Sequence, residues 1–183
     1  TGEDTLSLHD ALPICKGTVV RYMLEHFADV HLSVSATTRA PRPGELDGVD
    51  YFFLTEDEFK LLIETDQMLE YAIVHGKHYY GTPRQPVENA IASGKHVLLE
   101  IDIQGARLVK AARPETKTIF IAPPTWDDLV ARLRGRGTES VEEQERRLET
   151  ARVELQSQSE FDHVVINDEV ARCAHEVLEL MQA

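Results

Sequence analysis

Two arginines in a short loop are the first residues whose types and spacing suggest chemistry. Arg39 and Arg42 flank Pro41, and the hydroxyl residues Thr37 and Thr38 precede them. A guanidinium group can donate two parallel hydrogen bonds to one anion, so two such groups on a proline-stiffened loop suit a doubly charged monophosphate. A solvated surface loop with scattered charges explains the same pattern equally well.

Two tyrosines add to this possible anion site. Tyr51 and Tyr80 each lie at the end of a predicted strand, where the phenol could donate a hydrogen bond to the same phosphate. Taken singly, each tyrosine is better explained as an amphipathic residue at the edge of the core. The tyrosines therefore strengthen the phosphate interpretation only together with the arginines.

A second candidate phosphate site precedes the first predicted helix, which runs from Gly17 to about His26. The segment Lys16-Gly17-Thr18 lies where a phosphate-binding loop would end. In such a loop, glycines let backbone N–H groups point at phosphate. Asp10 and Cys15 stand where those glycines are expected, so the segment alone is a weak signal.

The order of the strands and helices that must position these residues indicates an α/β fold. Near-continuous apolar runs are typical of buried parallel strands, and they alternate here with helical patterns. We therefore expect a parallel sheet with helices packed on it. The buried strands are predicted at residues 96–101, 118–122 and 162–166. Further strands are predicted at 31–35, 51–54, 69–73 and 77–81. Helices are predicted at 17–26, 55–63, 87–93, 104–112, 125–134, 139–156 and 170–181.

Composition excludes several classes of protein. The 183 residues carry a formal net charge of −13, whereas a general nucleic-acid binder presents a basic face. No apolar run approaches the roughly 20 residues needed to cross a bilayer, and the N-terminus lacks a signal-peptide pattern. Cys15 and Cys173 match no metal or redox spacing. We expect a cytoplasmic protein without nucleic-acid or membrane partners, as a monomer or a homo-oligomer.

Several motifs, in order along the chain, resemble those of guanylate kinases. They are Ser-x-Thr-Thr-Arg-x-Pro-Arg-x-Gly-Glu from Ser35, Gly-x-Asp-Tyr-x-Phe, Glu-Tyr-Ala, Tyr-Tyr-Gly-Thr-Pro, Asp-Ile-Gln-Gly and Arg-Gly-Arg-Gly-Thr-Glu. The resemblance covers about Lys16 to the C-terminus. It implies a P-loop-kinase-type parallel sheet core with helices on both faces, a small mixed β lobe that binds GMP, and a helical lid. The core would comprise residues 16–34, 84–123 and 159–183, the lobe 35–83 and the lid 124–158.

The resemblance also implies the residues of a GMP site. Arg39, Arg42, Tyr51 and Tyr80 would clamp the phosphate, and Ser35, Glu70, Thr82 and Asp102 would recognise guanine. Guanine offers N1–H and an amino group as donors, which carboxylates can accept. Adenine has an acceptor at N1, so buried acceptors reject it. Without the resemblance, Glu70 is more simply an exposed strand residue and Asp102 a helix cap.

The remaining implied residues concern ATP and catalysis. Lys16, Gly17, Thr18, Arg132, Arg136 and Asn167 would bind ATP. The catalytic residues would be Lys16, Arg39, Arg132, Arg136 and Arg147. Glu100 and Asp102 would contact Mg²⁺ through water, since this ion usually keeps several of its waters. A basic helix end that complements the helix dipole is the alternative explanation of the lid arginines.

The activity implied is a reversible transfer of the γ-phosphoryl group of ATP to GMP, which gives ADP and GDP. Two alternatives remain. One is a catalytically inactive guanylate-kinase-like module that binds phosphopeptides, although such a module does not need the lid arginines or both guanine-reading carboxylates. The other is a different P-loop monophosphate kinase, which an assay of GMP against AMP would distinguish.

The N-terminal segment departs from the family pattern. Residues 1–15 stand in place of the apolar strand and glycine-rich loop, and the change occurs abruptly at Lys16. The stretch from Leu6 to Ile14 resembles translated sequencing-adapter read-through. We therefore hypothesise that residues 1–15 are not native to the gene, and we expect the chain as written to bind GMP better than ATP and to turn over poorly.

Overall fold

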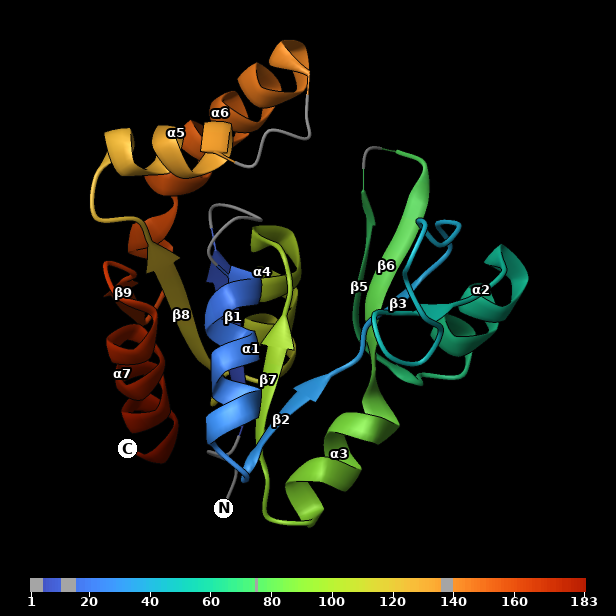
Figure 1. Cartoon of the computed structure of the whole chain (residues 1–183). Helices are drawn as coiled ribbons and strands as arrows, with labels where there is room; N and C mark the ends of the chain where they lie inside the picture. The colour runs from blue at the N-terminus through green and yellow to red at the C-terminus, as the bar shows by residue number, and fades with distance from the viewer. Residues whose placement is uncertain (1–4, 11–15, 75, 136–139) are drawn as a thin grey trace.

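The computed structural model describes residues 5–10, 16–74, 76–135 and 140–183, with the backbone alone for residues 5–10, 16 and 143. These residues form a parallel sheet with helices on both faces, a smaller β lobe beside it, and two helices above it (Figure 1). Among them, no helix is both long and apolar enough to cross a membrane.

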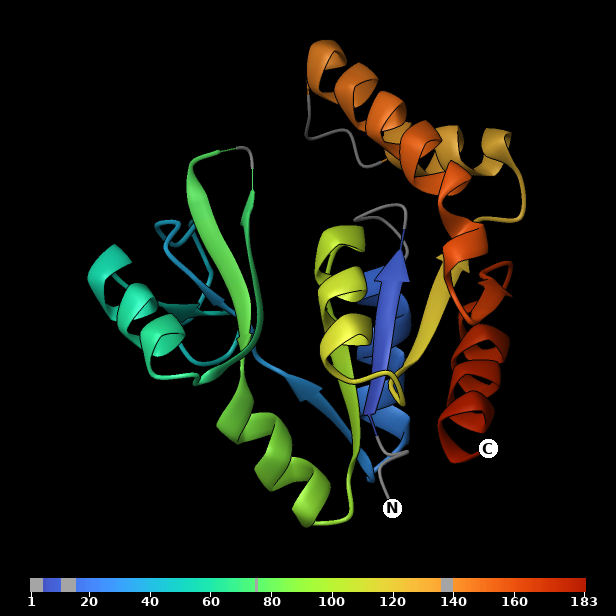
Figure 2. The same cartoon turned by 180° about the vertical axis from the view of Figure 1, so that it is seen from behind.

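The central sheet has the strand order β2-β7-β1-β8-β9, and all of its strands are parallel. Their carboxyl ends therefore share one edge, the upper edge in Figure 2. In α/β proteins this edge is where ligands bind. The strands are β1 (Thr5–Asp10), β2 (Val30–Ser33), β7 (His96–Glu100), β8 (Lys117–Ala122) and β9 (His163–Ile166).

Alternating side chains of β7 bury both faces of this sheet. Leu98 packs with helices α1 (Lys16–His26) and α7 (Val170–Gln182). Val97 and Leu99 point to the other face, where they meet α3 (Arg84–Ala92) and α4 (Ile103–Ala112). A strand buried on both faces must be apolar at nearly every position, which explains the continuous run in the sequence. Cys173 is buried in the first of these clusters.

The smaller lobe is a mixed four-stranded sheet with the order β4-β3-β6-β5. The strands are β3 (Ala36–Thr37), β4 (Phe52–Phe53), β5 (Met68–Val74) and β6 (His78–Pro83). Helix α2 (Glu56–Glu64) begins with a capping box, in which Thr55 and Glu58 satisfy each other's backbone N–H groups. Phe59 on this helix is fully buried against the sheet.

One glycine makes the pairing of β5 and β6 possible. A Cβ on Gly81 would lie 2.5 Å from the carbonyl oxygen of Glu70 and 2.9 Å from the Cβ of Tyr71. Neither atom can move without distorting the neighbouring strand. Gly81 therefore lets the two strands approach closely and sets Glu70 opposite Thr82 in the register.

The third part is a pair of helices, α5 (Trp126–Gly135) and α6 (Val141–Gln156). Leu129 and Leu133 of α5 pack with Ala151 of α6 and with Phe120 of β8. The guanidinium carbon of Arg152 lies 5.0 Å from the centre of the Trp126 ring. The pair lies above the carboxyl edge of the sheet in both views (Figures 1 and 2). A short 3-10 helix, Gln158–Glu160, leads back to β9.

The predicted α/β class, the predicted helices and the buried strands are confirmed, with ends that shift by a few residues. The two-residue strand β3 was not predicted, and the strand predicted at 51–54 has only two residues. Residues 5–10 form the central strand β1 between β7 and β8, because pairing in a parallel sheet is made by backbone groups.

Candidate active site

A cavity of 220 Å³ lies between the lobe and the carboxyl edge of the central sheet. It is lined by the strand pair β5 and β6, by the end of β7 and by the first turn of α4. Five of the residues predicted for GMP meet here, although they are far apart in the sequence. These five are Ser35, Tyr51, Glu70, Tyr80 and Asp102, joined by Ala72, Val74, Gly81, Glu100, Ile101 and Gly105.

Glu70 provides a buried acceptor in this cavity. Its exposed fraction is 7%, and burial raises the pKa of its carboxyl group from 4.5 to about 7. The hydroxyl of Thr82 donates a hydrogen bond of 2.7 Å to Glu70 Oε1, which opposes this rise, while the charge of Asp102 adds to it. Thr82 is itself buried and does not line the cavity, so it fixes the orientation of Glu70.

Asp102 provides the second carboxylate and also caps a helix. It directly precedes α4, and its Oδ1 accepts the backbone N–H of Gly105 at 2.7 Å. A Cβ on Gly105 would lie 3.3 Å from Asp102 Oδ1 and 3.3 Å from Glu70 Oε2. The two carboxylates therefore converge on the space next to this glycine. Such a pair can accept hydrogen bonds from a ring that carries adjacent N–H donors.

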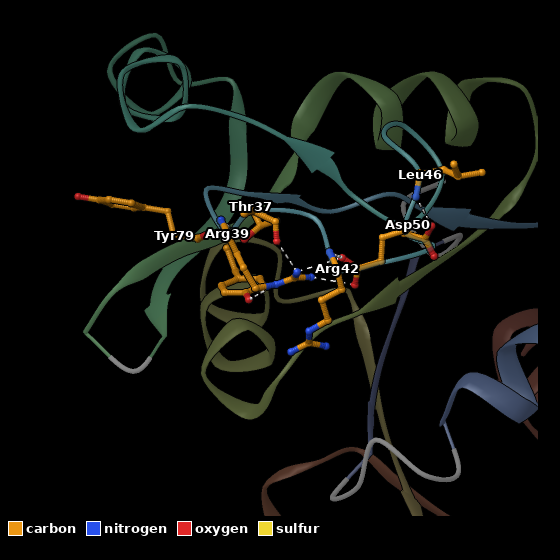
Figure 3. Close-up of polar contacts among 9 residues, drawn as sticks. Thr37, Arg39, Arg42, Leu46, Asp50 and Tyr79 are labelled. Carbon is orange, nitrogen blue, oxygen red and sulfur yellow. Dashed lines mark hydrogen bonds and ion pairs between the residues drawn. The ribbon is translucent and has the colours of Figure 1, made fainter. Parts of the chain in front are cut away.

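Arg39 does not line the cavity itself but contacts Tyr51 and Tyr80, two of the residues that do. Figure 3 shows the polar contacts of Arg39 with its neighbours. The Nε of Arg39 donates to the Tyr80 hydroxyl at 3.1 Å, and its guanidinium carbon lies 5.5 Å from the centre of the Tyr51 ring. The two tyrosine rings meet edge to face with centroids 6.0 Å apart. Burial raises the pKa of Tyr51, with a smaller contribution from the charge of Tyr80, so its hydroxyl keeps its proton. Arg39 and the two tyrosines can donate hydrogen bonds to an anion.

Arg39 and Arg42 differ in their surroundings. Arg39 forms an ion pair with Glu45 at 2.9 Å, and only 13% of its side chain is exposed. Arg42 is exposed, and the structure gives its guanidinium no hydrogen-bond partner among the described residues. Figure 3 shows the Arg42 side chain extending away from the loop. Glu45 was not singled out from the sequence, although it ends the motif that contains both arginines.

The residues predicted for ATP lie around the first turn of α1 and on the two helices above the sheet. Helix α1 begins at Lys16, and Gly17 and Thr18 lie in its first turn, where unpaired backbone N–H groups can bind an anion. Arg132 donates to the backbone oxygen of Asn167 at 2.9 Å, which brings two of the predicted residues together. The Lys16 side chain and all of Arg136 lie outside the described part, and Arg147 lies on α6.

The predicted metal contacts fit only an indirect role. Glu100 ends β7 and lines the cavity, and Asp102 is already engaged by the cap of α4. Within the described part of the chain, no three His, Cys, Asp or Glu side chains form a group that could hold a metal ion.

Comparison with known proteins gives one family. The guanylate kinase family model matches residues 15–183. The guanylate kinase of Leifsonia xyli subsp. xyli is 57% identical over 166 residues, which are 91% of this chain and 65% of that protein. The guanylate kinase of Rhodococcus jostii is 54% identical, over 91% of this chain and 81% of that protein. The crystal structure of guanylate kinase from Anaplasma phagocytophilum superposes with a TM-score of 0.76 at 32% identity, over 97% of this chain and 84% of that one. The chain belongs to the guanylate kinase family.

Proposed function

We propose that this chain transfers the γ-phosphoryl group of ATP to GMP and releases ADP and GDP, acting in the cytoplasm in purine nucleotide metabolism. The observation that carries this proposal is the convergence of Glu70 and Asp102 in a 220 Å³ cavity that is also lined by Tyr51 and Tyr80, with Arg39 hydrogen-bonded to the Tyr80 hydroxyl. Carboxylates together with these donors complement a guanine base joined to a phosphate.

Base recognition would depend on the ionised form of Glu70. The carboxylates of Glu70 and Asp102 accept the N1–H and amino hydrogens of guanine, and the Ser35 hydroxyl adds a polar contact at the cavity wall. Adenine would turn a lone pair toward the same carboxylates. A buried acceptor that loses its donor costs about 1–3 kcal/mol, so the site disfavours AMP.

The acceptor phosphate would lie between the tyrosines and the arginine loop. The hydroxyl groups of Tyr51 and Tyr80 donate to it, and Arg42 supplies an exposed cation that has no hydrogen-bond partner among the described residues. Arg39 supplies a further donor from beside the tyrosines. Two points of attachment, base and phosphate, would fix the acceptor for in-line attack on the donor.

The donor phosphates would bind where α1 begins, with Lys16, Gly17 and Thr18 at the helix N-terminus. Arg132, Arg136 and Arg147 would approach from above and stabilise the charge on the moving phosphoryl group, and Asn167 would contact the adenine end. Mg²⁺, held through water by Glu100 and Asp102, would neutralise phosphate charge. No covalent enzyme intermediate is needed, because positioning and electrostatic stabilisation supply most of the catalysis of phosphoryl transfer.

This function requires three parts that move relative to one another. We assign residues 16–34, 84–123 and 159–183 to the core, residues 35–83 to the GMP lobe and residues 124–158 to the lid. Closure of lobe and lid would exclude water from the transfer. We also retain the proposal that residues 1–15 are not native to the gene. Sequencing of the genomic locus tests it, and an in-frame coding sequence for these fifteen residues would contradict it.

The test of the function is product formation by the purified chain. GMP or AMP is incubated with ATP and Mg²⁺, and the diphosphate formed is measured by anion-exchange chromatography. We expect GDP formation and a preference of about 10³ for GMP over AMP, which Glu70→Gln reduces and the exposed control Glu56→Gln leaves unchanged. Equal use of AMP would contradict the proposal. Binding of a phosphopeptide that GMP displaces, without GDP formation, would favour the inactive module.

A further inference from the structure

Glu45 closes the loop that carries both arginines. Its Oε1 accepts from Arg39 Nη2 at 2.9 Å, and its Oε2 accepts from Arg39 Nη1 at 3.0 Å. The same Oε2 accepts the backbone N–H of Arg42 at 2.6 Å. Gly44, with a φ of +90°, allows the turn that returns the Glu45 backbone N–H to the Arg42 carbonyl at 3.0 Å. One carboxylate thus holds the guanidinium of Arg39 and the backbone of Arg42.

A count of hydrogen-bond donors shows how fully Arg39 is engaged. A guanidinium group has five N–H donors. Arg39 uses Nε for Tyr80, one N–H of Nη1 for the Ala40 carbonyl and another for Glu45, and one N–H of Nη2 for Glu45. Within the described residues, a single N–H on Nη2 is left for a ligand. Arg39 is therefore oriented by the protein before any phosphate binds.

The charges of Arg39, Arg42 and Glu45 give the two arginines different roles. The hydrogen bonds from Arg39, followed by the one from the Arg42 backbone, hold the pKa of Glu45 below its usual range, so its carboxylate stays ionised. The pair of Arg39 and Glu45 is then neutral as a unit. Within residues 37–45, the positive charge that this pair does not neutralise is that of Arg42.

We propose that Glu45 is a positioning residue for the acceptor phosphate, which acts by holding Arg39 against Tyr80 and Tyr51. This inference rests on the proposed function, because the phosphate is that of GMP. Without Glu45, the guanidinium of Arg39 loses two of its four contacts and the backbone N–H of Arg42 loses its acceptor. The phosphate donors would then have to be ordered at the moment of binding, which lowers affinity.

Removal of the Glu45 charge also has an effect that would strengthen GMP binding, so the direction of the change in affinity tests the proposal. A carboxylate close to the phosphate site repels a dianion and competes for Arg39, so its neutralisation could strengthen GMP binding. A merely structural role would weaken the binding of any ligand of the lobe. The three cases differ in their effects on GMP and on guanosine, which has the same base and no phosphate.

The experiment compares Glu45→Gln with the wild-type chain and with Glu56→Gln, whose carboxylate lies exposed on α2, 3.7 Å from Lys60. GMP binding is measured by isothermal titration and guanosine binding by ligand-observed NMR. We expect Glu45→Gln to weaken GMP binding about tenfold and to change guanosine binding less than about twofold. The control should change neither. Unchanged or stronger GMP binding, or an equal loss for guanosine, would overturn the inference.

A double-mutant cycle tests whether Glu45 acts through Arg39. A lysine at position 39 cannot form the bidentate ion pair with Glu45. In an Arg39→Lys background, Glu45→Gln should therefore weaken GMP binding by less than about threefold. The same tenfold loss in both backgrounds would contradict this route. Failure of the proposed function has a different signature, because the wild-type chain itself would then show no preference for GMP over AMP.

Discussion

Replacement of Glu70 by glutamine should stabilise the free protein while it damages the site. Burial raises the pKa of this carboxyl group from 4.5 to about 7. Below about pH 4.5 it is neutral in both the folded and the unfolded chain, so it imposes no penalty. As the pH rises toward 7, the unfolded chain ionises first and unfolding becomes more favourable. At about 1.36 kcal/mol per pKa unit, the loss of folding free energy reaches about 3 kcal/mol above pH 7.

Glu70→Gln removes this pH-dependent loss because an amide stays neutral. Its carbonyl can still accept the hydrogen bond from Thr82. Urea denaturation followed by circular dichroism should therefore show similar stability for wild type and variant near about pH 4, and a variant more stable by about 3 kcal/mol near about pH 8.5. A difference that does not change with pH, or a variant that is less stable at high pH, would refute the reasoning.

The same carboxyl group couples GMP binding to proton release. Guanine needs the ionised form of Glu70, and below about pH 7 the free protein carries the proton there. Binding near about pH 6 should therefore release close to one proton, which titrations in buffers of different ionisation enthalpy detect. Glu70→Gln should release none and bind GMP about 5-fold to 150-fold more weakly, the equivalent of about 1–3 kcal/mol.

Three further predictions follow from the geometry. Gly81→Ala should cost roughly 2–4 kcal/mol in urea denaturation, because its Cβ meets a backbone oxygen at 2.5 Å. Gly135→Ala, which meets no described residue within 4 Å, should change stability by less than about 1 kcal/mol. Asp102→Asn keeps an acceptor for the cap of α4, so its melting temperature should stay close to wild type while the KM for GMP rises about tenfold or more; Asp102→Ala should lose about 1 kcal/mol of stability as well. The paired change Asp10→Gly with Cys15→Gly should strengthen ATP binding in isothermal titration and leave GMP binding unchanged, and unaltered ATP affinity would count against a defective phosphate loop.

The elements of the fold that depend on patterns among neighbouring residues were predictable from the sequence. The strands β7, β8 and β9 appear in the sequence as apolar runs, because a strand covered on both faces has nearly no polar positions. The start of α2 was also predictable, because its capping box is formed by Thr55 and Glu58, which are only three residues apart in the sequence. Strand β3 could not be predicted, since two residues contain no period and its pairing with β4 and β6 is set by tertiary structure.

Five of the residues predicted for GMP line one cavity, but the contacts that orient them were not predictable from the sequence. The orientation of Glu70 depends on its position opposite Thr82, and that register is fixed by the close approach at Gly81. No local pattern contains this information. The ion pair of Arg39 with Glu45 depends in the same way on a turn at Gly44. For Asp102, the cap and the place in the cavity were considered as alternatives, and the structure contains both.

The contact between Arg152 and Trp126 has a practical consequence. The chain contains one tryptophan, and it lies on α5 with a cation from α6 over its ring. The indole is therefore a built-in fluorophore for this helix pair, and its emission responds to any change in how α5 and α6 pack against the end of β8. The closure over nucleotide that we propose for residues 124–158 can thus be tested in real time on the unlabelled chain, separately from Tyr51 and Tyr80 in the proposed phosphate site.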